Sequence, residues 1–178
     1  MTIVITLPHF FDGEVQHIIR LLDRGDIDLL HIRKPQATCH EVEALIRQLP
    51  ETLRHRMVLH DHHTLAMQYG LHGIHLNSRN LEAPEGWHGS LSISCHSISE
   101  LEEQKKKPFN YLSLSPIFDS ISKQGYLSAF SQEEIQAAHR QGIIDHRVMA
   151  LGGVTFDKIP IIQEMGFGGA MILGDAWR

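Results

Sequence analysis

Two kinds of hydrophobic pattern alternate along the chain. Short runs rich in β-branched residues, typical of buried strands, are separated by longer segments whose apolar residues recur every three or four positions, as in amphipathic helices. Residues 2–7 and 12–25 form the first such pair, and the helical pattern stops at Gly25. The pattern predicts strands over residues 2–7, 27–33, 56–60, 73–76, 91–94, 110–115, 147–151 and 168–173.

The segments between these strands predict the helices. They cover residues 12–25, 39–49, 62–69, 97–106, 131–140 and 155–165, and a link containing Gly and Pro follows the fourth strand. Alternation of strand and helix implies parallel pairing with right-handed crossovers. Eight such strands favour an α/β fold of the (β/α)8 TIM barrel type over a doubly wound sheet, which more often has five or six strands. We expect a single barrel domain over residues 1–178, with the eighth helix absent because the sequence ends soon after the eighth strand.

Composition limits the classes of partner. The 178 residues are 42% hydrophobic and carry a formal net charge of −5, which argues against a nucleic-acid binder because phosphate contacts need a surplus of Lys and Arg. No segment is apolar over the roughly 18 residues of a membrane span. The two cysteines, Cys39 and Cys95, lie far apart, and the opening residues resemble no export signal. We therefore expect a cytoplasmic protein that binds small molecules. Where the eighth helix is missing, either the sequence given lacks its C-terminal tail or a neighbouring subunit of a homo-oligomer covers the barrel.

Polar residues follow the predicted strands from the second to the eighth. In a TIM barrel the C-terminal ends of the strands carry the functional site, so these residues are expected to converge. In strand order they are His31, Arg33 and Lys34; His60 and Asp61; His75, Asn77 and Asn80; Ser94 and His96; Ser115; Gly152 and Gly153; and Gly174 and Asp175.

Residue type suggests two anion sites at this end. Gly152, Gly153 and Gly174 have no Cβ, so backbone N–H groups there can approach a phosphate, and a helix beginning near Thr155 adds its positive end. The alternative is that these glycines only turn the chain after a strand.

The second anion site is predicted around the segment SPIFDSISKQG, residues 115–125. Arg33, Lys34 and Lys123 would surround a more highly charged anion, and hydroxyl groups of the loop would donate hydrogen bonds. Those hydroxyls belong to Ser120 and Ser122. Taken singly, each cation would more often be solvated than functional.

Nearly the full chain resembles the thiamine-phosphate synthases and the related TenI-type thiazole tautomerases. The resemblance runs through LLHIRKP, VLHDHHTLAMQYGLHGIHLNSRN, ISCHS, LSPIFDSISKQG, VMALGGV and GFGGAMILGD. The corresponding family patterns are Q-x-R-[DE]-K, N-D-R, H-[LI]-G-Q-x-D, S-x-H, G-P-[IV]-F-x-T-x-T-K and A-I-G-G-I, in the same order and at similar spacing.

The resemblance implies an activity and roles for the residues. The family joins hydroxymethylpyrimidine diphosphate to thiazole phosphate with loss of pyrophosphate, assisted by Mg2+. It implies metal ligands at Asp61 and Asn80 and thiazole phosphate at the Gly-Gly loop. Residues matching the family loop and strand ends are expected to be catalytic (Arg33, Lys34, Ser94 and Lys123) or substrate-binding (His31, His60, His75, His96, Ser120, Ser122, Gly152, Gly153 and Gly174).

Departures from the family pattern leave three alternatives open. One metal carboxylate is the amide Asn80, and the lysine after strand two comes one position early, which fits a member that binds phosphate ligands without turnover. A tautomerase would need another base, because its histidine position holds Pro116. A metal-dependent hydrolase could use Asp61 with the histidines at the strand ends, namely His31, His60, His75 and His96.

Overall fold

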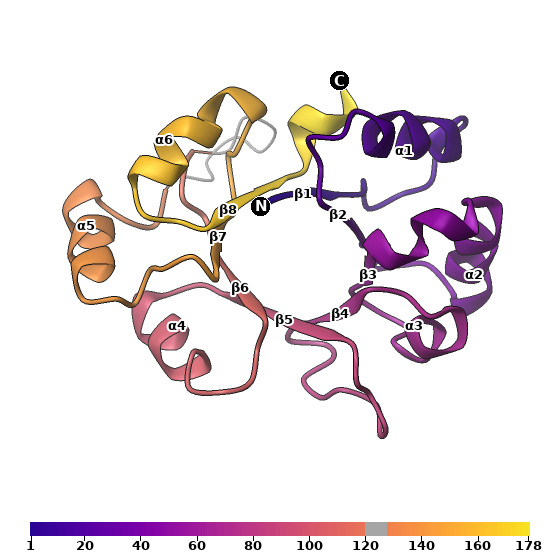
Figure 1. Ribbon diagram of the computed structural model, residues 1–178, viewed down its shortest axis with the longest axis horizontal. Helices are drawn as coiled ribbons and strands as arrows, with labels where there is room; N and C mark the ends of the chain where they lie inside the picture. Colours follow the sequence, from indigo (N-terminus) through magenta and orange to yellow (C-terminus); the bar gives the residue numbers. More distant parts are fainter. Residues whose placement is uncertain (120–127) are drawn as a thin grey trace.

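Eight parallel strands close into a barrel in the computed structural model, which describes residues 1–119 and 128–178. The strands follow chain order, and β1 pairs with both β2 and β8 (Figure 1). The predicted (β/α)8 TIM barrel is therefore confirmed. The strands are β1 Thr2–Ile5, β2 Leu29–Ile32, β3 Met57–Leu59, β4 Gly73–Leu76, β5 Ser90–Cys95, β6 Tyr111–Leu114, β7 Val148–Ala150 and β8 Gly169–Ile172.

Helices surround the strands in Figure 1. Thr38 and Ser131 begin α2 and α5 with capping boxes, each side chain accepting from the backbone N–H of a glutamate three residues later. The predicted helix over 155–165 is divided into two because Pro160 starts a new helical turn. The helices are α1 Glu14–Asp23, α2 Cys39–Gln48, α3 Thr64–Tyr69, α4 Ile98–Gln104, α5 Gln132–Arg140 and α6 Ile159–Glu164, with 3-10 helices η1 Glu51–Arg56, η2 Phe156–Lys158 and η3 Gly174–Trp177.

The layout differs from a regular eightfold repeat at two connections. The link between β4 and β5, residues 77–89, contains an isolated bridge between Asn77 and Asn80 in place of a helix. After β8 the chain forms η3, which the sequence pattern did not predict. The ring of Trp177 in η3 stacks on His17 of α1 at 4.9 Å between centroids, and its Nε1 donates to the carbonyl of Ile5 at 2.7 Å.

Alternation along the strands builds two cores. Leu30 and Ile32 of β2 face outward into the large cluster under the helices, whereas Leu29 packs inside the barrel with Ile3, Met149 and Met171. His31, His75, Ser92 and Ser113 are also fully buried inside the barrel, from β2, β4, β5 and β6. The buried polar residues of the interior thus come from β2, β4, β5 and β6, whereas β1, β7 and β8 contribute the apolar residues Ile3, Ile5, Met149 and Met171.

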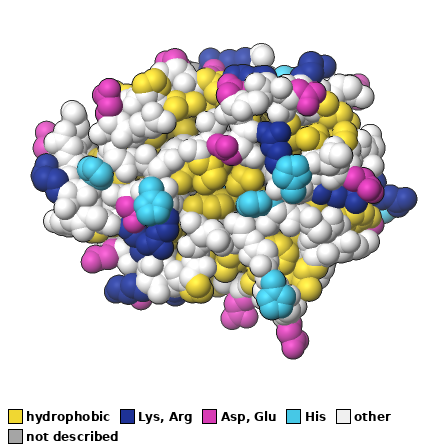
Figure 2. Space-filling view, in the orientation of Figure 1, with side chains coloured by type: hydrophobic (Ala, Val, Ile, Leu, Met, Phe, Trp, Pro, Cys, Tyr) yellow, Lys and Arg dark blue, Asp and Glu magenta, His cyan; other side chains and the backbone are white. Residues whose placement is uncertain are grey.

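Charged side chains of both signs are mixed over the face seen in Figure 2, and apolar side chains are visible near its centre. Such mixing gives no extended basic field on that face. None of the described helices is long and apolar enough to cross a membrane.

Candidate active site

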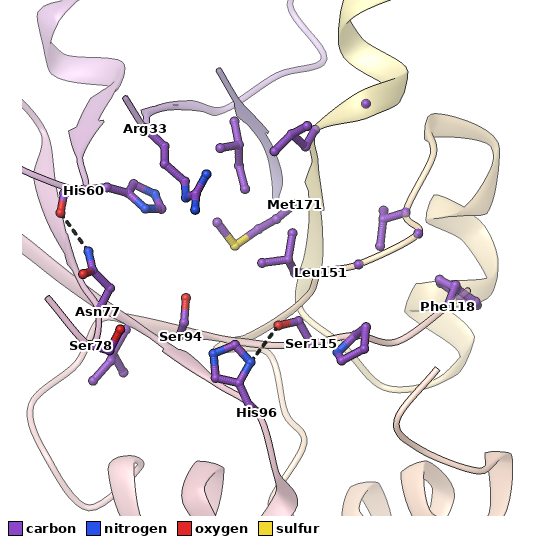
Figure 3. A pocket seen from close by; sticks show the side chains of 18 of the residues that line it. Arg33, His60, Asn77, Ser78, Ser94, His96, Ser115, Phe118, Leu151 and Met171 are labelled. Carbon is purple, nitrogen blue, oxygen red and sulfur yellow. Dashed lines mark hydrogen bonds between the residues drawn. The ribbon is translucent and has the colours of Figure 1, made fainter. Parts of the chain in front are cut away.

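A cavity of about 860 Å3 opens at the C-terminal ends of the strands. Figure 3 shows polar side chains on one side of it and Leu151 and Met171 on the other. The predicted residues that the structure brings together here are Arg33, His60, Asn77, Ser94, His96, Ser115, Gly152, Gly153, Gly174 and Asp175. Further lining residues include Ile5, Arg79, Pro116, Phe118, Thr155, Leu173 and Arg178.

Arg33 supplies a guanidinium to this cavity from just beyond β2 (Figure 3). Its backbone N–H donates to the Thr6 hydroxyl at 2.9 Å, which fixes the start of the loop. Burial lowers the pKa of Arg33, the nearby Arg79 lowers it further, and Asp61 opposes both. Arginine still remains protonated. No carboxylate within residues 1–119 and 128–178 forms a salt bridge with this guanidinium, so it can accept an anionic ligand.

Asp61 and Asn80 lie together, as predicted, but in an arrangement that includes Arg79. The fork of Arg79 donates to both carboxylate oxygens of Asp61 at 3.2 Å, and Asn80 Nδ2 donates to Oδ1 at 2.8 Å. Mg2+ requires oxygen ligands, and it competes poorly for a single carboxylate that an arginine already neutralises. As they lie, these residues do not fit the two-carboxylate magnesium site that the resemblance implies.

Lys34 lies outside the cavity. Its side chain is fully buried, and Nζ donates to the Glu14 carboxylate at 2.5 Å and to the carbonyls of Leu7 and His9 at 2.9 and 2.7 Å. Burial lowers the pKa of Lys34, and Glu14 opposes that shift. The predicted catalytic contact of Lys34 is corrected: its ammonium is fully engaged by the Glu14 carboxylate and by two carbonyls of the loop after β1.

The four predicted histidines separate into two pairs. His31 and His75 are fully buried inside the barrel, below the cavity, whereas His60 and His96 line it. His96 Nδ1 lies 3.2 Å from the Ser115 hydroxyl, and His75 Nε2 lies 2.8 Å from the Ser94 hydroxyl. Direct substrate contact therefore stays a prediction for His60 and His96. The predicted substrate contact of His31 and His75 is corrected, because both rings are fully buried and neither lines the cavity.

Gly152 and Gly153 both adopt positive φ, at 90° and 63°. A Cβ on Gly152 would lie 2.7 Å from Pro116, and one on Gly153 would lie 2.3 Å from the carbonyl oxygen of Asp119. The absence of a side chain thus lets this loop pack against the loop after β6. Lys158 Nζ also donates to the Gly153 carbonyl at 2.6 Å, which brings a cation to this side.

The loop after β8 brings a carboxylate to the same side. Asp175 accepts from the backbone N–H of Phe156 at 3.0 Å and lies 3.6 Å from the Arg178 guanidinium. One of the helix-start N–H groups predicted for a phosphate is therefore already occupied. The neighbouring Thr155 hydroxyl is buried and has no partner within the described residues.

Three predicted residues, Ser120, Ser122 and Lys123, lie outside the described residues. The flanking chain is held beside the cavity: Phe118 N donates to the Gly152 carbonyl at 3.0 Å, and Ser128 N donates to Asp119 Oδ1 at 2.7 Å. The predicted role of the loop in anion binding stays a prediction.

Sequence reasoning missed Arg79 and the apolar wall. Arg79 stands in the quoted stretch LNSRN, two residues beyond the bridge residue Asn77, so its place after a strand was available as a signal. The wall consists of Ile5, Leu151, Met171 and Leu173, which appeared in the sequence only as strand residues.

Comparisons with known proteins match most of this chain, and a family model, two relatives and one solved structure point to the same family. The family model for thiamine monophosphate synthase matches residues 2–174. Thiamine-phosphate synthases of Cronobacter sakazakii and Serratia proteamaculans are each 26% identical over 167 residues, covering 89% of this chain and 79% and 78% of theirs. The crystal structure of thiamine phosphate pyrophosphorylase from Bacteroides thetaiotaomicron is 40% identical, with a TM-score of 0.86, and the match covers 99% of this chain and 84% of that one.

Proposed function

Because the chain belongs to the thiamine monophosphate synthase family, we propose that this enzyme is the transferase that joins hydroxymethylpyrimidine diphosphate to thiazole phosphate and releases pyrophosphate. The observation that carries the proposal is the Arg33 guanidinium, which has no carboxylate partner among the described residues and faces a cavity of about 860 Å3. Such a cation suits a leaving group that gains negative charge as its bond breaks.

The two sides of the cavity suit the two parts of such a reaction. Ile5, Leu151 and Met171 offer an apolar wall against which flat rings can pack. Arg33 follows β2, the neighbour of β1, so its guanidinium lies beside this wall, and it binds the diphosphate in our proposal. Holding both substrates in one cavity lowers the entropic barrier to their reaction, and the protein then needs no general base for the bond-forming step.

We place the thiazole phosphate on the side of Gly152, Gly153 and Gly174. Lys158 and Arg178 bring positive charge to that side, and the buried hydroxyl of Thr155 is available as a donor. Asp175 opposes anion binding unless Arg178 compensates its charge, so this half of the proposal depends on their ion pair.

Magnesium is the part of the family chemistry that these residues support least. Bound to a diphosphate, the ion would supply positive charge. Here Arg79 already forms a salt bridge with Asp61, and Arg79 lines the cavity. We propose that Arg33, which has no carboxylate partner among the described residues, provides much of that positive charge in this chain.

The test is a direct assay of the purified protein with hydroxymethylpyrimidine diphosphate and thiazole phosphate, with and without Mg2+, in which thiamine phosphate and pyrophosphate are both quantified. We expect equal amounts of the two products. We expect Arg33→Ala to abolish most turnover and Tyr69→Phe, whose hydroxyl binds Glu43 away from the cavity, to leave it unchanged. Binding of both substrates without any product would favour the non-catalytic member of the family. Rearrangement of a thiazole substrate alone would favour the tautomerase.

A further inference from the structure

A chain of hydrogen bonds runs through the barrel interior and ends at the cavity. The hydroxyl of Tyr111 on β6 lies 2.6 Å from Nε2 of His31 on β2. Nδ1 of His31 lies 2.9 Å from Nε2 of His60, just beyond β3. His60 lines the cavity, and its remaining ring nitrogen, Nδ1, has no partner among the described residues. Three buried side chains thus connect the barrel interior to one atom at the site.

Burial favours the neutral form of both imidazoles in this chain, since no carboxylate among the described residues is hydrogen-bonded to either ring. Burial lowers the pKa of His31 and of His60 well below the usual value, and the neighbouring His75 lowers both further. Arg33 lowers the pKa of His60 as well, and so does Arg79. A neutral imidazole has one N–H donor and one acceptor nitrogen, so the position of one proton decides what each ring offers its neighbours.

Tyr111 determines the direction of the chain. Burial raises the pKa of its hydroxyl, so the phenol keeps its hydrogen, and His31 Nε2 is its one hydrogen-bond partner among the described residues. The hydrogen of Tyr111 is then left for His31 Nε2, because a buried hydroxyl without an acceptor is costly. His31 must carry its proton on Nδ1 and donate to His60 Nε2. His60 in turn carries its proton on Nδ1, at the cavity.

We propose that Tyr111 is a positioning residue, which fixes the tautomers of His31 and His60 so that His60 presents an Nδ1–H donor to the cavity beside Arg33. The ligand it serves is an acceptor oxygen of a phosphate or diphosphate group, and this assignment of the ligand rests on the proposed function. The opposite tautomer would present a lone pair to the same oxygen and repel it. An amide side chain at position 31 would donate without help, whereas an imidazole there requires Tyr111.

A metal ion is the competing use of the same cluster. Ligand nitrogens of His31, His60 and His75 lie within 4.8 Å of one another. However, both nitrogens of His31 and both of His75 are already hydrogen-bonded. The His60 and His75 rings are stacked at 4.3 Å with 29° between planes, so their lone pairs do not converge on one point. The geometry therefore favours the hydrogen-bonded chain of Tyr111, His31 and His60, which we call the relay.

Nitrogen-15 NMR of histidine-labelled protein tests the tautomers without any ligand. The signals of His60 are assigned with a His60→Asn variant, because the chain has 14 histidines. We expect wild-type His60 to carry its proton on Nδ1, the form that free histidine in water disfavours. Tyr111→Phe should convert a large share of His60 to the Nε2–H form, and Tyr69→Phe should not. Wild-type His60 protonated on Nε2, or purified protein that retains a stoichiometric metal ion on these rings, would overturn the relay.

Calorimetry with inorganic pyrophosphate tests the consequence at the cavity. Tyr111→Phe should weaken binding about three- to tenfold, the loss of one oriented hydrogen bond. Adding His31→Gln should restore both the Nδ1–H form of His60 and the affinity, because the amide donates unaided. A folded double variant that restores neither would mean that Tyr111 acts by packing. If His60 has the expected tautomer and wild type binds no pyrophosphate, the proposed function and the ligand assignment fail together while the relay remains.

Discussion

The two sides of the barrel present different groups to a ligand. On the side of β2 to β6, these groups are polar side chains placed by the strands, namely His60 and Arg33, with His31 buried and hydrogen-bonded to His60. On the side of β7, β8 and β1, the cavity is lined by apolar residues and by Gly152 and Gly153, where a Cβ would collide with neighbouring backbone. Polar side chains can be exchanged while the cavity keeps its shape, whereas the backbone side has little room for change.

The largest expected effect distinguishes Lys34 from its neighbour Arg33, on the side of β2 to β6. Lys34 follows Arg33 directly but is buried against Glu14. Lys34→Ala leaves a buried carboxylate without its partner, so we expect the free energy of unfolding to fall by about 3 to 5 kcal/mol. Denaturant titration measures it. The double variant Lys34→Met/Glu14→Leu should lose much less, and the folded fraction of Lys34→Ala should bind pyrophosphate normally. Intact stability with lost affinity would return Lys34 to the site.

The next largest expected effect is a loss of stability at Gly153, on the side of β7, β8 and β1. Gly153→Ala combines an unfavourable positive φ with a Cβ 2.3 Å from the Asp119 carbonyl oxygen. We expect it to reduce the free energy of unfolding by about 2 to 4 kcal/mol. Gly142→Ala is the matched control, since Gly142 also has positive φ but no atom within 4 Å of its Cβ position, and about 1 kcal/mol is expected there. Equal losses at both positions, measured by denaturant titration, would show that the loop after β6 yields easily.

A third prediction compares one arginine on each side of the barrel. Arg33 has no carboxylate partner within the described residues, whereas Arg178 lies 3.6 Å from Asp175. Arg33→Ala should weaken pyrophosphate binding about 10- to 100-fold, because a charge-assisted contact contributes about 1.5 to 3 kcal/mol. Arg178→Ala should change it less than about threefold, since its charge is partly compensated. Calorimetry measures both affinities. A larger loss of pyrophosphate affinity in Arg178→Ala than in Arg33→Ala would place the diphosphate on the side of Gly152 and Gly153.

Much of the fold was predictable because strand and helix differ in period. All eight strands were predicted, and β4 was predicted to the residue, since Gly73 and Asn77 bound a short apolar run. The 3-10 helix η3 was not predicted, because its anchor is tertiary: Trp177 stacks on His17 of α1, 160 residues earlier in the chain.

The site was predicted in part for a similar reason. Arg33 and Gly152 follow strands, and the C-terminal ends of parallel strands meet at one mouth. The orientation of Lys34 could not be predicted, because it depends on a carboxylate in α1 that only the folded chain brings near. The ion pair of Arg79 with Asp61 was missed since it joins the ends of two different strands.

The smallest expected effect tests whether this ion pair has replaced a metal site. Asn80→Asp provides a second carboxylate beside Asp61, but Arg79 lies within reach of both and would neutralise them. We therefore expect the single variant to gain little magnesium affinity in the presence of pyrophosphate. Arg79→Gln/Asn80→Asp should gain about tenfold, or about 1.4 kcal/mol, because both carboxylates are then free to face the ion.

Titration calorimetry with Mg2+ measures this gain, and Asn110→Asp is the control for added charge. Asn110 precedes β6 at the opposite end of the barrel, and its Oδ1 accepts from Leu91 N at 2.8 Å, a bond that aspartate retains. It should leave magnesium affinity unchanged. A tenfold gain in Asn80→Asp alone would mean that Arg79 releases Asp61 easily, so the missing carboxylate, and not the arginine, limits metal binding. No gain in the double variant would mean that the β2 to β4 side has lost the shape of a metal site, leaving Arg33 as the principal cation for the diphosphate.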